Sequence, residues 1–194
     1  MVALLPGSRK HVVEHLAGDQ LQIAERIREA IPGARFVVSV ANDQVRSIVE
    51  SSLRSSNVKA RMIESPIASW IDSVDLVLAA SGTTTLEVAL HARPMIVMYN
   101  ASRLAYQLVG RWMIQTKFLS LPNILAGRKI VPEFMPYYTS TGPIADRAIE
   151  LLQSDEARTT MVRELAKTVL PLRDTHAAQR TAELLLDMIS RRPR

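Results

Sequence analysis

The sequence of 194 residues has no cysteine. This absence excludes disulfide bonds, thiolate zinc sites and a cysteine nucleophile, and it is compatible with a cytosolic protein. Long apolar runs are also missing, since none reaches the roughly 18 residues that a transmembrane helix needs. Residues 1–7 lack the basic start and the long apolar stretch of a signal peptide. We therefore expect a cytoplasmic protein.

Aromatic residues make up only 5% of the sequence, whereas basic residues are in excess. The 24 lysines and arginines outnumber the 19 acidic residues, which gives a net charge of +5. Such an excess can favour nucleic acids, anionic lipids or phosphorylated ligands. The basic residues are spread out, apart from Arg191, Arg192 and Arg194, and few aromatics accompany them. The pattern therefore predicts no nucleic-acid partner.

Strand-like and helix-like apolar patterns alternate along the chain, which predicts an α/β fold with a parallel sheet. We expect a Rossmann-like, doubly wound sheet with helices on both faces in residues 1–142, and C-terminal helices in residues 143–194, as a single domain. The expected strands are residues 2–5, 35–40, 58–63, 74–79, 94–99 and 118–121. The expected helices are residues 16–31, 42–55 (capped by Asn42), 66–73, 83–91, 102–114, 144–152, 155–169 and 175–190.

A turn of sequence Pro-Gly-Ser-Arg, residues 6–9, follows the first expected strand. Gly7 allows close backbone approach, Ser8 can donate a hydrogen bond, and Arg9 can form a bidentate pair with a phosphate. The same residues also suit an ordinary strand-to-helix turn with a surface arginine. The pattern alone leaves both interpretations open.

A second turn, from Ser81 through Gly82 and Thr83 to Thr84, follows another strand and begins a helix. Its hydroxyl and N–H groups can hold a diphosphate, and Glu87 could reach ribose hydroxyls. Alternatively, one of the two threonines caps the helix and the glutamate complements the helix dipole, and this role does not exclude a ligand. The turn matches neither GxGxxG nor Walker A, so neither NAD nor ATP hydrolysis is indicated.

A third segment, Ser-Leu-Pro-Asn at residues 120–123, could start a helix that directs Asn123 into a cleft, or could be a turn with a capping asparagine. Glu133 could contact a sugar or ribose, or be a solvated loop carboxylate. Residues 102–114 are apolar with two arginines, which fits either an interfacial helix at lipid headgroups or a core helix packed on the sheet.

Several kinds of catalytic site are not indicated. The four histidines, His11, His15, His91 and His176, have no metal-ligand spacing, so no metal is expected. No Ser-His-Asp order, Gly-x-Ser-x-Gly motif or paired-carboxylate site is evident.

At these motifs the sequence resembles the C-terminal half of bacterial lipid-A-disaccharide synthases. The resemblance covers nearly the whole chain, and the Ser-Leu-Pro-Asn segment is its most specific part. The similar segments are residues 4–9 (Leu-Leu-Pro-Gly-Ser-Arg), 80–87 (Ala-Ser-Gly-Thr-Thr-Thr-Leu-Glu), 94–99 (Pro-Met-Ile-Val-Met-Tyr), 116–128, 131–134 and 177–179.

The resemblance implies half of a GT-B glycosyltransferase, in which two Rossmann-like domains face a cleft. The C-terminal domain holds the UDP-sugar donor, and the N-terminal domain holds the acceptor and supplies the general base. The family transfers 2,3-diacylglucosamine from its UDP conjugate to 2,3-diacylglucosamine 1-phosphate (lipid X), releasing UDP. It uses no metal or other cofactor, acts on the cytoplasmic face of the inner membrane as a peripheral protein, and can dimerise through its C-terminal helices.

By matched position, the resemblance assigns Arg9 to the donor diphosphate and to catalysis, and Glu87 to the ribose. It places residues 102–114 near the membrane-facing side. The remaining residues that it assigns to the donor site are Gly7, Ser8, Ser81, Gly82, Thr83, Thr84, Tyr99, Asn123 and Glu133.

The sequence departs from the family at three places. Val12 stands where the family usually has an acidic residue, for which Glu14 is a candidate substitute. Pro136 replaces a family glutamine. No acceptor domain is present, which leaves a fragment, a split protein or a degenerate homologue. We expect the chain alone to bind UDP without transferring sugar. The alternatives are a UDP-sugar epimerase or hydrolase and a non-catalytic nucleotide-sugar-binding domain.

Overall fold

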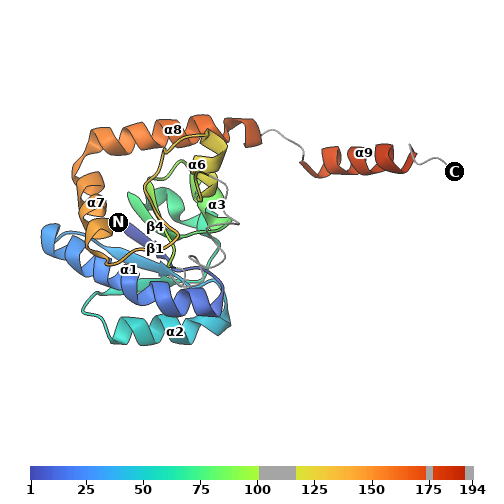
Figure 1. The fold of residues 1–194 in the computed structure, drawn as a ribbon. Coiled ribbons are helices and arrows are strands. Elements are labelled where there is room, and N and C mark those ends of the chain that lie inside the picture. The colour runs from blue at the N-terminus through green and yellow to red at the C-terminus, as the bar shows by residue number, and fades with distance from the viewer. Residues whose placement is uncertain (101–116, 174–176, 191–194) are drawn as a thin grey trace.

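A six-stranded parallel sheet forms the centre of the computed structural model, which describes residues 1–100, 117–173 and 177–190 (Figure 1). The strand order is β3-β2-β1-β4-β5-β6, and each neighbouring pair is parallel. The predicted doubly wound α/β fold is confirmed. The strands are β1 (Val2–Leu5), β2 (Phe36–Ser39), β3 (Ala60–Ile63), β4 (Leu76–Ala80), β5 (Met95–Met98) and β6 (Glu133–Phe134).

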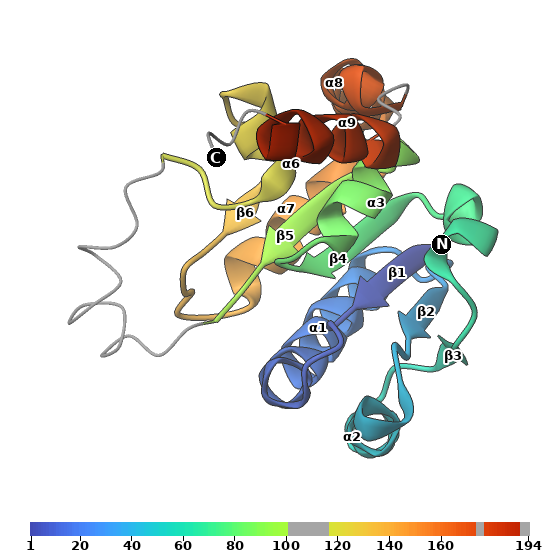
Figure 2. The same cartoon turned by 90° about the vertical axis from the view of Figure 1, so that its right-hand side faces the viewer.

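Helices cover both faces of this sheet (Figures 1 and 2). On one face lie α1 and α2, and α7 packs against α1 and β4; on the other face, α3, α6 and α8 pack together. The helices are α1 (Lys10–Ala30), α2 (Asp43–Arg54), α3 (Thr84–Leu90), α6 (Leu121–Ala126), α7 (Gly142–Gln153), α8 (Asp155–Arg173) and α9 (Ala177–Ser190), with the short 3-10 helices η1 (Ile67–Ser69) and η2 (Ile71–Ser73).

The strands β1, β4 and β5 are almost completely buried. The side chains of β1 are at most 2% exposed, and those of β5 are 0% exposed. Strands in a parallel sheet that is covered on both faces are continuous apolar runs, as Val-Ala-Leu-Leu and Met-Ile-Val-Met are here. This rigid core fixes where the chain leaves the carboxyl end of each strand.

One predicted strand is wrong. Residues 118–121 do not join the sheet; instead α6 begins at Leu121, with Pro122 in its first turn. Proline has no N–H to donate to a sheet, and its fixed φ suits the first turn of a helix. The last described strand is β6, in a stretch where no strand was predicted. The helix predicted at 102–114 lies outside the described residues.

The last described helix differs from the rest. Figure 1 shows α9 extending away from the sheet and its covering helices. Five large apolar side chains on it are 54–68% exposed: Leu184, Leu185, Leu186, Met188 and Ile189. None of the helices in the described ranges is both long and apolar enough to span a membrane.

Candidate functional site

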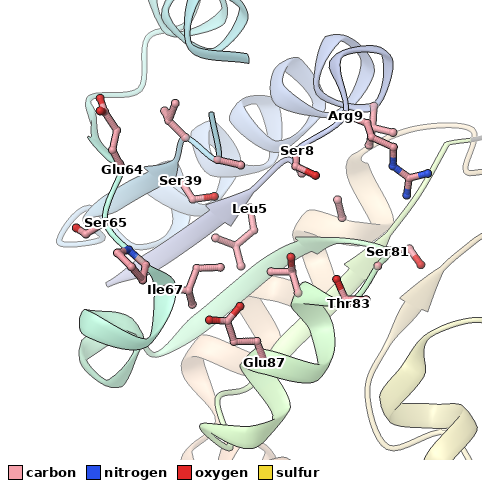
Figure 3. A pocket seen from close by; sticks show the side chains of 18 residues that line it. Leu5, Ser8, Arg9, Ser39, Glu64, Ser65, Ile67, Ser81, Thr83 and Glu87 are labelled. Atoms are coloured by element: carbon pink, nitrogen blue, oxygen red, sulfur yellow. The ribbon is translucent and has the colours of Figure 1, made fainter. Parts of the chain in front are cut away.

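A cavity of about 470 Å³ opens at the carboxyl ends of the first four strands (Figure 3). β1 and β4 are neighbours in the sheet, although they are far apart in the sequence. After β1 the chain continues to α1 on one face of the sheet, and after β4 it continues to α3 on the other face. Ligands of open α/β sheets bind in the crevice at such a switch point. The cavity is lined by Leu5, Gly7, Ser8, Arg9, Val12, Ser39, Val40, Ala41, Glu64, Ser65, Pro66, Ile67, Ala80, Ser81, Gly82, Thr83, Thr84 and Glu87.

The turn after β1 is held in a conformation that requires glycine. Gly7 has φ of +108°, and a Cβ there would lie 3.5 Å from side-chain carbons of Ala80 and Val12. The carbonyl of Ser8 accepts a hydrogen bond from Asn42 Nδ2 at 3.1 Å. Asn42 also caps α2, as predicted, because its Oδ1 accepts from Val45 N at 3.3 Å. The turn is therefore fixed from the neighbouring β2–α2 connection.

Arg9 supplies the positive charge of this turn. It is exposed at the start of α1, and it forms no ion pair with any residue of the described ranges. Figure 3 shows Arg9 and Ser81 together at one end of the cavity, with the guanidinium group directed toward the second turn. An arginine without a carboxylate partner is available to an anionic ligand.

The turn after β4 exposes several donors. The predicted capping by Thr83 or Thr84 is wrong: Thr83 makes no capping bond, and instead Thr85 Oγ1 donates to the Gly82 carbonyl at 2.7 Å. Within the described part of the chain, the N–H groups of Gly82, Thr83 and Thr84 have no backbone acceptor. These N–H groups and the two threonine hydroxyls can bind a ligand at the cavity.

Two carboxylates line the cavity, in different environments. Glu64 is ion-paired with Arg46 of α2, and this hydrogen bond raises the pKa of Arg46. Glu87, on α3, has no ion-pair partner among the described residues and is half-buried. Figure 3 shows its carboxylate at the end of the cavity away from Arg9. It can therefore accept hydrogen bonds from ligand hydroxyl groups.

Sequence reasoning missed the lining residues at and after the ends of β2 and β3, namely residues 39–41 and 64–67. These segments contain no recognisable ligand motif. The signal that could have found them is topological, because the carboxyl ends of parallel strands share one edge of the sheet. Figure 3 shows Ile67 near Glu87 and Ser65 beyond it, and Pro66 also lines the cavity, so this wall is partly apolar.

Three residues assigned to the donor site by resemblance do not line this cavity: Tyr99, Asn123 and Glu133. Glu133 lies on β6, and its carboxylate accepts from Leu119 N at 3.3 Å and from Ser120 N at 2.9 Å. Tyr99 is half-buried just after β5 and donates its N–H to Phe134. Both residues join β6 to neighbouring segments.

Asn123 is completely buried, so the prediction that it points into a cleft is wrong. Its Oδ1 accepts from Ile130 N at 2.7 Å and Val131 N at 2.9 Å, and its Nδ2 donates to the Val131 carbonyl at 2.9 Å. All three bonds hold the backbone after α6. In the Ser-Leu-Pro-Asn segment, the asparagine therefore has a structural role, since it fixes the backbone of Ile130 and Val131.

The departure at Val12 gives the cavity an apolar wall. Val12 is 7% exposed and lies below the Gly7 turn. Glu14, the candidate substitute for the missing acid, is exposed, lies 3.9 Å from Lys10 Nζ and does not line the cavity. Across the described ranges, no three histidine, aspartate or glutamate side chains gather as a metal site would require.

Comparison with protein families gives one extensive match. The model of a family described as lipid-A-disaccharide synthetase matches residues 1–186. Proteins named lipid-A-disaccharide synthase from Pseudomonas entomophila and Myxococcus xanthus are each 34% identical, over 96% and 97% of this chain. The matches cover 50% and 49% of those proteins, so the chain spans about half the length of these relatives.

Solved structures share the fold at much lower identity. A mutant of S. aureus TarM, crystallised with fondaparinux, alpha-GlcNAc-glycerol and UDP, has a TM-score of 0.58 and 12% identity, over 95% of this chain and 35% of that one. A putative UDP-N-acetylglucosamine 2-epimerase from Listeria monocytogenes has a TM-score of 0.54 and 14% identity, over 84% and 39%.

Proposed function

Because this chain belongs to the lipid-A-disaccharide synthetase family, we propose that its cavity binds the UDP moiety of a UDP-sugar donor. The observation that carries the proposal is the placement of two donor-rich turns around one cavity, together with an arginine and a glutamate that have no ion-pair partner in the described ranges. The diphosphate would lie between the Gly7–Arg9 turn and the Ser81–Thr84 turn. Arginine and backbone N–H groups are suitable partners for its charge.

The other end of the cavity suits a nucleoside. Glu87 would accept hydrogen bonds from the ribose hydroxyls, since it has no ion-pair partner in the described ranges. The uracil would lie against Pro66 and Ile67, whose apolar side chains line the cavity. Most ligand sites combine apolar walls with a few placed polar groups in this way.

The reaction proposed for the complete enzyme is glycosyl transfer. A 2,3-diacylglucosamine unit would pass from its UDP conjugate to 2,3-diacylglucosamine 1-phosphate, giving lipid A disaccharide 1-phosphate and UDP. The acceptor oxygen would bond to the anomeric carbon as the bond from that carbon to UDP breaks. Arg9 and the N–H groups of the Ser81–Thr84 turn would stabilise the negative charge that develops on UDP.

The acceptor half would come from outside this chain. The relatives are about twice as long, which supports an additional domain that binds the acceptor and supplies the general base. We also propose a cytoplasmic location with peripheral contact at the inner membrane, and no metal or other cofactor. The exposed apolar residues of α9 support a further proposal, that the C-terminal helices take part in a homodimer.

The same geometry suits two other functions. A UDP-sugar epimerase or hydrolase would need titratable groups facing the anomeric carbon. Among the described lining residues, none at the Arg9 end of the cavity is a histidine or a carboxylate, which favours transfer with an outside base. A non-catalytic nucleotide-sugar-binding domain differs only in having no acceptor partner. A neighbouring gene for a Rossmann-like acceptor domain would favour the enzyme.

Calorimetric titration of the purified chain with UDP tests the site. We expect saturable binding, weakened about tenfold or more in Arg9→Ala, because a charge-assisted hydrogen bond to phosphate contributes about 1.5–3 kcal/mol. Glu87→Ala should weaken the binding of UDP and leave the binding of inorganic pyrophosphate unchanged. Arg35→Ala, an exposed arginine outside the cavity lining, is the matched control. Binding that survives both cavity substitutions would place UDP elsewhere.

Activity of the chain alone is a separate measurement. Radiolabelled donor and acceptor are incubated with the purified chain, and the products are separated by thin-layer chromatography. We expect no disaccharide, because the base and the acceptor site would lie in another domain. Disaccharide formation by this chain would contradict the proposal that the general base and the acceptor site lie in another domain.

A further inference from the structure

A buried glutamine on α1 contacts two strands at once. Gln20 is 1% exposed, and its Nε2 donates to the carbonyls of Leu5 at 3.3 Å and Leu78 at 3.1 Å. Leu5 is the last residue of β1, and Leu78 lies in β4 two residues before that strand ends. These strands are paired in the sheet, although 58 positions separate Gln20 from Leu78. One amide group thus joins α1, β1 and β4.

The joined strands are those that carry the two donor-rich turns. Leu5 itself lines the cavity, and Gly7 follows two positions later. Ala80 and Ser81, at the end of β4, line the cavity opposite. The helix that carries Gln20 begins at the cavity, next to Arg9. Any change in the spacing of β1, β4 and α1 would therefore change the distance between the donors of the two turns.

Stability alone does not explain a glutamine at this position. Its Oε1 is buried and has no hydrogen-bond partner in the part of the chain that the structure describes. A buried acceptor without a partner is destabilising, whereas leucine would fill a similar volume without that cost. The side chain lies within an apolar core, so leucine is also compatible with the surroundings.

We infer that Gln20 is a positioning residue of the nucleotide site, which sets the spacing of the Gly7–Arg9 and Ser81–Thr84 turns through the carbonyls of Leu5 and Leu78. This inference rests on the proposed function and deepens it. Gln20 touches no ligand, since it does not line the cavity. It acts through the backbone of two residues that lead into the turns.

A substitution by leucine separates positioning from general stability. We expect Gln20→Leu to unfold at the same temperature as the unchanged chain or higher, yet to bind UDP about tenfold more weakly, since two hydrogen bonds no longer hold the turns. Gln22→Leu is the matched control: it lies on the same helix, is exposed, and does not line the cavity. UDP affinity within twofold of the unchanged chain in Gln20→Leu would overturn the inference.

Hydrogen–deuterium exchange provides a readout that needs no ligand. The amides of β1 and β4, which are paired in the sheet, and of Ser81, whose N–H donates to the Met98 carbonyl, should exchange faster in Gln20→Leu and at the unchanged rate in Gln22→Leu. A wild-type chain that fails to bind UDP counts against the proposed function, and the exchange rates then decide the role of Gln20. Unchanged exchange of the β1, β4 and Ser81 amides would overturn the inference.

A second variant covers the case in which Gln20→Leu does not fold. In Gln20→Glu, the protonated carboxyl group can donate to one carbonyl, whereas the ionised carboxylate can donate to neither. The ratio of the variant's Kd for UDP to that of the unchanged chain should therefore fall as the pH is lowered from 8 to 6. Taking the ratio removes the titration of UDP itself. A ratio that does not change with pH would contradict a positioning role.

Discussion

At the residue scale, buried polar side chains in this protein hold backbone groups near loops. The described residues of this kind are Gln20, Thr85 and Asn123; a fourth buried polar residue, Ser120, has a hydroxyl group with no hydrogen-bond partner in the described ranges. Thr85 bonds the carbonyl of Gly82 in the second turn, and Asn123 bonds three backbone groups after α6. A buried polar group is destabilising unless it is hydrogen-bonded, so such residues occur where a loop must be fixed.

Asn123→Ala tests whether this asparagine is structural. The substitution leaves the N–H groups of Ile130 and Val131 and the Val131 carbonyl without these partners. We expect the free energy of unfolding to fall by about 2–4 kcal/mol, measured by urea denaturation. UDP affinity of the folded variant should stay within about twofold, since Asn123 does not line the cavity. A large loss of UDP affinity at unchanged stability would show that Asn123 contacts the ligand directly.

Sequence motifs predicted the cavity residues well where a turn directly follows a strand. Gly7, Arg9, Ser81 and Glu87 all line one cavity because parallel strands end at a common edge. Asn123 could not be placed in the same way. The direction of a side chain within the first turn of α6 depends on what packs around that helix, and the residues that bond it come seven and eight positions later.

At the scale of elements, α1 is attached to the segment that leads into α7. Tyr138 donates its hydroxyl group to Asp19, and Arg26 pairs with Asp146 at 2.9 Å. Burial and the Asp19 carboxylate raise the pKa of Tyr138. These links hold the C-terminal part of the chain against the helix that carries Gln20.

The raised pKa of Tyr138 predicts a loss of stability in alkaline solution. Below pH 10 the phenol is neutral in both the folded and the unfolded chain, so its stabilising contribution is complete. Above about pH 10 the unfolded chain ionises first, and stability falls as the pH rises. Urea denaturation between pH 8 and 11 should show a shallower decline in Tyr138→Phe than in the unchanged chain. Equal slopes would show that this hydroxyl is not held in the folded state.

The elements themselves followed from the sequence wherever a strand is fully buried, because continuous apolar runs between turn residues leave little ambiguity. The two errors lie outside that core: residues 118–121 were predicted to form a strand, and β6 was not predicted. β6 has only two residues, Glu133 and Phe134, and pairs with one neighbour. Such a short edge strand has no periodicity to detect; it forms because β5 offers its free edge.

At the scale of the whole molecule, and within the described ranges, α9 does not pack against the sheet or the helices that cover it (Figure 1). All of its described side chains are exposed, whereas α7 and α8 bury residues such as Ile144 and Leu165 completely. An apolar surface of this kind commonly marks an interaction site. The proposed homodimer and the proposed acceptor domain are both partners that could cover it.

Removal of α9 tests its independence from the fold. A chain that ends at Arg173 should melt within about 2 °C of the full chain and bind UDP equally, because α9 contributes no buried side chain among those described. Light scattering coupled to size-exclusion chromatography should show less self-association in the shorter chain. A marked fall in melting temperature would mean that α9 packs on the sheet in solution.

The described residues that line the cavity all lie between Leu5 and Glu87, in the first half of the chain. The proposed nucleotide site is thus encoded by one uninterrupted stretch of the gene, which recombination can transfer as a unit. Selection for the proposed donor would act on that stretch, while the region from β5 to α9 could accumulate substitutions independently of the donor. Evolutionary rates along this chain should therefore change near the end of α3.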